Sequence, residues 1–214
     1  MKIAIALFDR FTALDAIGPY EVLSRLPGAE IVFVGEAART FRTDMGMAVV
    51  AGAAFADVSS VDVLVVPGGP GTRAMTTDRP LLDWVRRVHP TTQWTTSVCT
   101  GSLVLAAAGV LKGVDATTHW GAMGDLAELG ANPVQERVVE RGKIVTAAGV
   151  SAGIDMALTL AARIAGDKVA QAIQLGIEYD PQPPFDAGNA AKASPDLVQA
   201  VLGLMTARAE APAS

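Results

Sequence analysis

Three short, uninterrupted apolar runs punctuate the first third of the chain, at Ile3–Phe8, Ile31–Val34 and Val63–Val66. A fourth segment, Gln93–Val98, is rich in β-branched residues. Short runs of this kind are typical of strands that are buried on both faces of a sheet. Segments with helical patterns separate them. Strands alternating with helices predict an α/β fold with a doubly wound, mostly parallel sheet and helices on both faces.

The remaining elements follow from periodicity, capping and turn signals. Asp15 and Ser151 are the expected N-caps of their helices. Two hairpins are expected, one within Thr40–Val50 and one around Arg141-Gly142, together with a short strand at Ala116–His119. Helices are expected over Asp15–Leu23, Pro80–Val88, Ser102–Val110, Trp120–Leu129, Ser151–Ile164, Lys168–Tyr179 and from Ser194 to about Arg208.

A chain of 214 residues suits a single domain over residues 1–214, with residues 209–214 as a disordered tail. The segment Asp180–Ala193 is rich in Pro, Ala and Asp and is long for a plain connection. It is predicted to be a lid over a site or an arm in a dimer.

The composition of the chain excludes several classes of site and binding partner. One cysteine excludes an internal disulfide and a CxxC pair, and two histidines exclude a histidine-rich metal site. A net charge of −5 argues against binding of nucleic acid or an anionic membrane. The apolar start of the chain is interrupted at Asp9-Arg10, far short of a signal peptide or a membrane span. We therefore expect a soluble, cytoplasmic protein.

The single cysteine, Cys99, stands between a predicted strand and a predicted helix. The first N–H groups of a helix lack partners and carry partial positive charge, which favours a reactive thiolate. The arrangement is similar to a nucleophile elbow, where a sharp strand-to-helix turn exposes a reactive side chain. The alternative is an inert cysteine in the core.

Other residues with chemical potential follow the ends of predicted strands. They are Asp15, the pair Gly68-Gly69, and His119. Ligands of parallel sheets bind at the carboxyl ends of the strands, so these residues are expected to gather around Cys99. A glycine amide beside a nucleophile can stabilise an oxyanion. Alternatively, Asp15 only caps a helix, Gly68-Gly69 is only a turn, and His119 is structural.

Five segments in order together resemble the ThiJ/PfpI superfamily. They are Leu14–Leu23, Val66–Gly69, Ser97–Leu105, Ala116–Trp120 and Ala152–Leu158. The resemblance extends from about Lys2 to Gly188. Within the superfamily the chain is most similar to the isocyanide hydratase branch, through the Asp15 region, Cys99-Thr100 and Glu178–Phe185.

The resemblance implies a flavodoxin-like sandwich that forms a homodimer, with Cys99 as nucleophile on a strained elbow. It implies that Asp15 lies beside the sulfur. It also implies that the backbone N–H groups of Thr100 and Gly69, next to Gly68, stabilise an anion. The substrate-binding residues are expected to be Ile17, Thr118, His119 and Trp120.

The implied reaction is hydration of an isocyanide to an N-substituted formamide through a Cys99 thioimidate. Asp15 serves as general acid and base. The expected partners are a small organic isocyanide and water. No metal or organic cofactor, nucleic acid or membrane is expected.

Departures from the superfamily pattern argue against some functions. Thr100 stands where the protease-like members have histidine, and no histidine follows His119 as glutamine amidotransferases require. The chain stops at Ser214, which is expected to leave no room for the helix-turn-helix domain of the regulators. The alternatives left open are a glyoxalase- or deglycase-type enzyme acting on 2-oxoaldehydes, a cysteine redox sensor or chaperone, and a binding protein.

Overall fold

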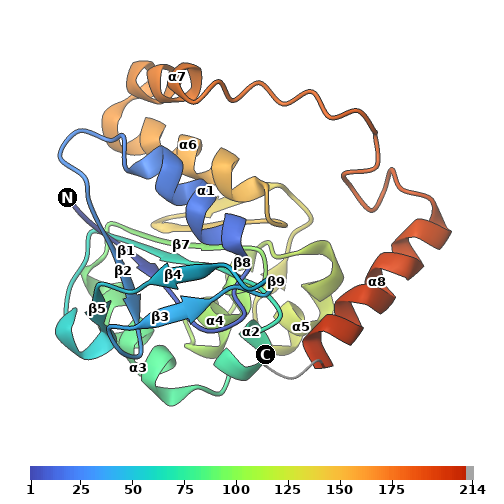
Figure 1. Ribbon diagram of the computed structural model, residues 1–214, viewed down its shortest axis with the longest axis horizontal. Helices are drawn as coiled ribbons and strands as arrows, with labels where there is room; N and C mark the ends of the chain where they lie inside the picture. Colours follow the sequence, from blue (N-terminus) through green and yellow to red (C-terminus); the bar gives the residue numbers. More distant parts are fainter. Residues whose placement is uncertain (211–214) are drawn as a thin grey trace.

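The protein is built on a seven-stranded sheet, and its computed structural model describes residues 1–210 (Figure 1). The strand order is β10-β11-β7-β6-β1-β2-β5. All neighbours are parallel except β10 and β11, which form the predicted antiparallel hairpin at one edge. The strands are β1 (Lys2–Ala6), β2 (Glu30–Gly35), β5 (Ala53–Ala54), β6 (Val63–Val66), β7 (Trp94–Val98), β10 (Val138–Arg141) and β11 (Ile144–Ala147). The predicted doubly wound sheet is confirmed.

Helices cover both faces of the sheet, with α1 and α6 on one side and α3 and α4 on the other (Figure 1). The helices are α1 (Ala13–Leu23), α2 (Thr72–Met75), α3 (Arg79–Val88), α4 (Gly101–Ala107), α5 (Met123–Glu128), α6 (Ala152–Ala165), α7 (Asp167–Gly176) and α8 (Pro195–Glu210). Short 3₁₀ turns occupy η1 (Phe55–Asp57), η2 (His89–Thr91) and η3 (Trp120–Ala122). Within residues 1–210, no helix is both long and apolar enough to cross a membrane.

Two small sheets lie beside the main one. The predicted hairpin within Thr40–Val50 is present as β3 (Thr40–Arg42) and β4 (Ala48–Val50). The strand predicted at Ala116–His119 is shorter, because only β8 (Asp115–Ala116) pairs, with β9 (Asn132–Pro133). The strand pairing therefore ends before Thr117, Thr118 and His119.

The predicted helix ends differ from the structure in several places. Thr12, and not Asp15, is the N-cap of α1, so Asp15 lies inside the first turn. Ser151 is the N-cap residue of α6, as predicted, but its side chain makes no capping hydrogen bond. Helix α4 ends at Ala107, because Gly109 adopts a left-handed conformation with φ 85° and turns the chain.

The C-terminal region also differs from the prediction. Ala209 and Glu210, placed in a disordered tail by the sequence analysis, are the last residues of α8. Residues 211–214 lie outside the described part of the chain. The segment Asp180–Ala193 has no regular structure, and it carries the chain from α7 across to α8 (Figure 1).

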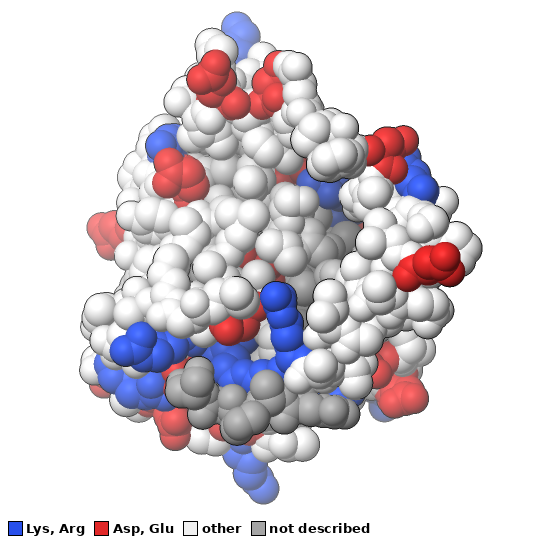
Figure 2. Space-filling model, turned by 45° about the vertical axis from the view of Figure 1, so that its right-hand side comes forward, with Lys and Arg blue, Asp and Glu red and all other residues white. Residues whose placement is uncertain are grey.

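The central strands are apolar because both of their faces are covered. Ile3, Ile5 and Leu64 are fully buried between the two helical layers. The indole of Trp84 stacks on Phe55 at 4.7 Å, and its buried N–H donates to the Val58 carbonyl (2.8 Å). On the molecular surface seen from the side of α8, most residues are uncharged, and acidic and basic side chains are scattered among them (Figure 2).

We expect Leu64→Ala to lower the free energy of unfolding by about 2–5 kcal/mol, since it leaves a cavity at the centre of the sheet. The matched control is Leu175→Ala in α7, where the leucine is 82% exposed. This control should change stability by less than about 0.5 kcal/mol. Chemical denaturation measures both, and equal losses would contradict the assigned core.

Candidate active site

The chain makes a strained turn at Cys99, directly between β7 and α4. Its φ is +56°, a left-handed conformation that costs a residue with a Cβ about 1–2 kcal/mol. Hydrogen bonds hold the peptide groups on both sides. The Cys99 N–H donates to the Ala148 carbonyl (2.9 Å), and the Cys99 carbonyl accepts from the Thr118 hydroxyl (3.0 Å) and the Ser102 hydroxyl (3.3 Å). The predicted sharp strand-to-helix turn at Cys99 is therefore present.

Two glycines allow the turns after β6 and β7 to touch backbone to backbone. A Cβ on Gly101 would lie 2.1 Å from the Val66 carbonyl oxygen. A Cβ on Gly68 would lie 2.5 Å from the Thr100 nitrogen. Both distances are far below contact, so only glycine fits at either position. This approach places the backbone of Gly68 against that of Thr100, the residue after Cys99.

Asp15 projects from the first turn of α1 into this junction and is fully buried. The Gly68 N–H donates to Asp15 Oδ2 (2.9 Å). Asp15 Oδ1 has no conventional hydrogen-bond partner among residues 1–210, and the Cys99 thiol interacts with the carboxyl. Burial raises the pKa of Asp15 from 3.8 to about 7, and repulsion from Asp44 adds to the rise.

The Cys99 side chain is only 5% exposed. Burial raises the pKa of the Cys99 thiol, and the nearby Asp15 carboxyl raises it further. The N–H groups of Thr100 and Val150 and the Thr100 hydroxyl oppose the rise. The thiolate expected from the helix end is therefore not the resting form, because desolvation outweighs the few donors of a short helix. The thiol therefore keeps its proton at neutral pH, where the Asp15 carboxyl, with a pKa of about 7, is close to half protonated.

The Thr100 side chain connects the two turns. Its Oγ1 accepts the Gly69 N–H (3.0 Å) and hydrogen-bonds to the Thr72 hydroxyl (3.0 Å). The Gly69 amide is thus engaged in orienting Thr100. The second N–H that faces the sulfur belongs to Val150, where the sequence analysis expected that of Gly69.

A cavity of about 310 Å³ opens above Cys99. This volume is near the lower end of the ~300–1,000 Å³ typical of small-molecule sites. From the sheet edge and the loops it is lined by residues that include Gly69, Thr72, Cys99, Thr100, Leu103, His119 and Val150. The opposite wall comes from α8, through Leu202, Met205, Thr206, Arg208 and Ala209.

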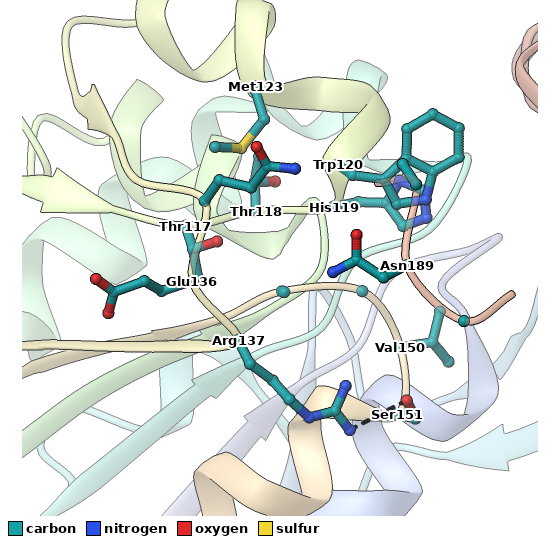
Figure 3. Close-up of a pocket in the computed structure, with 15 residues that line it drawn as sticks. Thr117, Thr118, His119, Trp120, Met123, Glu136, Arg137, Val150, Ser151 and Asn189 are labelled. Atoms are coloured by element: carbon teal, nitrogen blue, oxygen red, sulfur yellow. Dashed lines mark hydrogen bonds between the residues drawn. The ribbon is translucent and has the colours of Figure 1, made fainter. Parts of the chain in front are cut away.

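Not every predicted binding residue lines this cavity. Ile17 does not, and neither does Trp120. Trp120 and Thr118 face a neighbouring cavity of about 350 Å³, whose wall also includes Arg137 hydrogen-bonded to the Ser151 hydroxyl (Figure 3). His119 borders both cavities. Gly68 contacts the site through the hydrogen bond from its N–H to Asp15. Thr118 contacts it through the hydrogen bond from its hydroxyl to the Cys99 carbonyl.

His119 is held by its own backbone neighbour. Its Nδ1 accepts the Gly121 N–H (3.2 Å), and burial lowers the pKa of its ring, which favours the neutral form. In the described part of the chain, no three His, Cys, Asp or Glu side chains gather as a metal site would require.

Comparison with known proteins identifies the family to which the chain belongs. The profile of the DJ-1/PfpI family matches residues 1–163, which include Asp15, Gly68 and Cys99. The chain belongs to the DJ-1/PfpI family. The family match ends before α7 and α8.

Individual members of the family differ in function. The chain is 43% identical over 189 residues to an isonitrile hydratase of Pseudomonas putida, covering 88% of this chain and 83% of that protein. It is 26% identical to a deglycase of Pyrococcus abyssi, covering 68% and 89%. A solved ThiJ/PfpI family structure from Pseudomonas syringae superimposes with a TM-score of 0.93 at 36% identity, covering 98% and 87%.

Several site residues escaped the sequence analysis. Val150 lines the cavity and directs its backbone N–H to the sulfur, and a backbone donor has no signature in the side chains of the sequence. Thr72 begins the short helix α2, for which the sequence analysis saw no clear start after Pro70-Gly71. Leu202 and Met205 lie about one hundred residues from Cys99, in the last helix of the described chain. Only the folded chain brings them to the cavity.

We expect Gly101→Ala to lower the free energy of unfolding by about 1–3 kcal/mol, since the new Cβ collides with the Val66 carbonyl. It should also slow alkylation of Cys99 by iodoacetamide. The control is Gly124→Ala in α5, where a Cβ meets no atom within 4 Å. This control should leave stability unchanged or raise it by up to about 1 kcal/mol. Equal stability of the two variants would contradict the backbone contact.

We expect Asp15→Asn to stabilise the protein at pH 8 more than at pH 4.5. Because the folded pKa of Asp15 is raised from 3.8 to about 7, wild-type stability falls as pH rises through this window. Three pKa units correspond to at most about 4 kcal/mol. Urea denaturation of both proteins across this pH range measures the effect, and a pH-independent difference would rule out the raised pKa.

Proposed function

We propose that this protein hydrates an organic isocyanide to an N-substituted formamide, with Cys99 as nucleophile and Asp15 as general acid and base. The observation that carries the proposal is the free Oδ1 of Asp15, buried beside Cys99 in a carboxyl whose pKa is about 7. Such a group can give and take a proton near neutral pH. The 43% identity to an isonitrile hydratase supports the same reaction.

In the first step the Cys99 sulfur attacks the terminal carbon of the isocyanide. The proton shared by the thiol and Asp15 moves to that carbon as the carbon–sulfur bond forms. The product is a neutral thioimidate, in which the carbon carries one hydrogen, the sulfur and a double bond to nitrogen. Asp15 is left as a carboxylate.

In the second step Asp15 removes a proton from water as the water oxygen adds to the thioimidate carbon. Asp15 then passes this proton to the nitrogen. The carbon–sulfur bond breaks as the oxygen forms a carbonyl, and the remaining proton returns to the Asp15–Cys99 pair. One isocyanide and one water thus yield one formamide, and the site is regenerated.

The surrounding groups support this cycle. The N–H groups of Thr100 and Val150 stabilise negative charge on the sulfur when it attacks and when it leaves. Gly68 holds Asp15 Oδ2, which leaves Oδ1 to handle the proton. Gly69 and Thr72 orient the Thr100 hydroxyl. The reaction as written uses no cofactor, and we expect the active protein to be a cytoplasmic homodimer.

We expect Cys99→Ala to abolish formamide production and Asp15→Asn to lower kcat by at least about 10²-fold, since it removes the proton carrier. The matched control is Asp167→Asn, at an exposed aspartate that begins α7, which should retain full activity. Loss of a small aromatic isocyanide and appearance of its formamide measure all three variants. An Asp15→Asn enzyme with wild-type turnover would refute the role of Asp15.

The same preparations should be offered methylglyoxal, because His119 borders the cavity and a deglycase is among the relatives. Consumption of methylglyoxal dependent on Cys99, without isocyanide turnover, would replace the hydratase with a 2-oxoaldehyde enzyme. Turnover of neither substrate, by a folded protein with a reactive thiol, would leave a redox sensor or a chaperone.

A further inference from the structure

Helix α8 closes the Cys99 cavity from the side opposite the sheet. It lies at the far end of the long connection from α7 and packs beside the region of α5 and η3 (Figure 1). Five of its residues line the cavity, and two of these, Leu202 and Met205, are large and apolar. The family match ends at residue 163, so this wall lies outside the region that the family profile covers.

Two contacts fix the position of α8 over the cavity. The first is at Gly121, where a Cβ would lie 3.2 Å from Met205 Cε and 3.3 Å from Leu202 Cδ2. The absence of a side chain at Gly121 therefore lets both residues seat against the loop that follows His119. The second contact is at the end of α8, where the Arg10 guanidinium donates to the Arg208 carbonyl.

The apolar residues of this wall lie on one face of the helix. Leu202, Met205 and Ala209 follow one another at spacings of three and four residues, which places them on one face. Leu204 is 64% exposed on another face of the same helix. These three are thus the apolar residues of α8 that a ligand in the cavity contacts, beside the lining residues Thr206 and Arg208.

The residues on the two sides of the cavity differ in whether the proposed reaction fixes their identity and position. Cys99, Thr100 and Val150 supply the reacting sulfur and its N–H donors, so their positions are set by the chemistry. Leu202 and Met205 supply no group to the reaction. They face a ligand held at Cys99 only through apolar contact, and apolar contact discriminates between substituents by size.

We propose that Leu202 and Met205 determine substrate specificity, by setting the largest apolar substituent that fits between α8 and Cys99. The choice of an isocyanide as the substrate rests on the proposed function, whereas the size limit does not. A flexible methionine adapts to small differences in shape, so the limit should appear with bulky substituents and not with small ones.

The test compares reagents that differ only in size. Cys99 is the sole cysteine, so intact mass reports its reaction with N-methylmaleimide and with the much larger N-(1-pyrenyl)maleimide. In parallel, kcat/KM is measured for ethyl isocyanide and 2-naphthyl isocyanide. The variants are Met205→Ala and Leu202→Ala, and the matched control is Leu204→Ala.

Both cavity variants should raise the ratio of large-reagent to small-reagent rates by about tenfold over wild type, while Leu204→Ala leaves it unchanged. An unchanged ratio in both cavity variants would overturn the proposal. Equal acceleration of the large and small reagents would also overturn it, since α8 would then act as a general gate. If the wild type hydrates no isocyanide, the proposed function fails, but the maleimide ratio still decides the role of α8.

Discussion

The contact between the turn after β6 and the turn after β7 is the constraint on which the site depends. Glycine at 68 and at 101 removes the two side chains that would hold these turns apart. The contact places the Gly68 amide against Asp15 and holds Cys99 in a left-handed conformation at the start of α4. The cost of this backbone geometry is met by the buried sheet on either side, whose strands are covered on both faces.

The buried junction also decides the protonation chemistry. Exclusion of water raises the pKa of both the Asp15 carboxyl and the Cys99 thiol. The Asp15 carboxyl raises the pKa of the thiol further, whereas the interaction with the thiol lowers that of Asp15. The pair therefore retains a proton that an exposed aspartate and an activated cysteine would lose. A site of this kind is suited to delivering a proton to carbon as a sulfur attacks, which is what hydration of an isocyanide requires.

Much of the fold could be predicted because its signals are local. The apolar runs of the central strands, the Arg141-Gly142 hairpin and the strand–cysteine–helix order are visible in short stretches of sequence. Asp15 was found as a site candidate from its place after a strand, but its role as a helix cap was wrong. Its side chain turns to the Gly68 amide, and no local signal reports a partner 53 residues away.

The sequence by itself determined the sheet and the strand-to-helix turn at Cys99, and it singled out Cys99 and Asp15 as candidate site residues, because each depends on residue type and order. Only the tertiary structure decided the protonation of the thiol, the Val150 N–H as a donor to the sulfur, and the α8 wall of the cavity. The tertiary structure also shows that Ile17 and Trp120, which were predicted to bind substrate, do not line that cavity. These properties depend on desolvation and on backbone groups brought together across the chain, and neither is written in the side chains of a local segment.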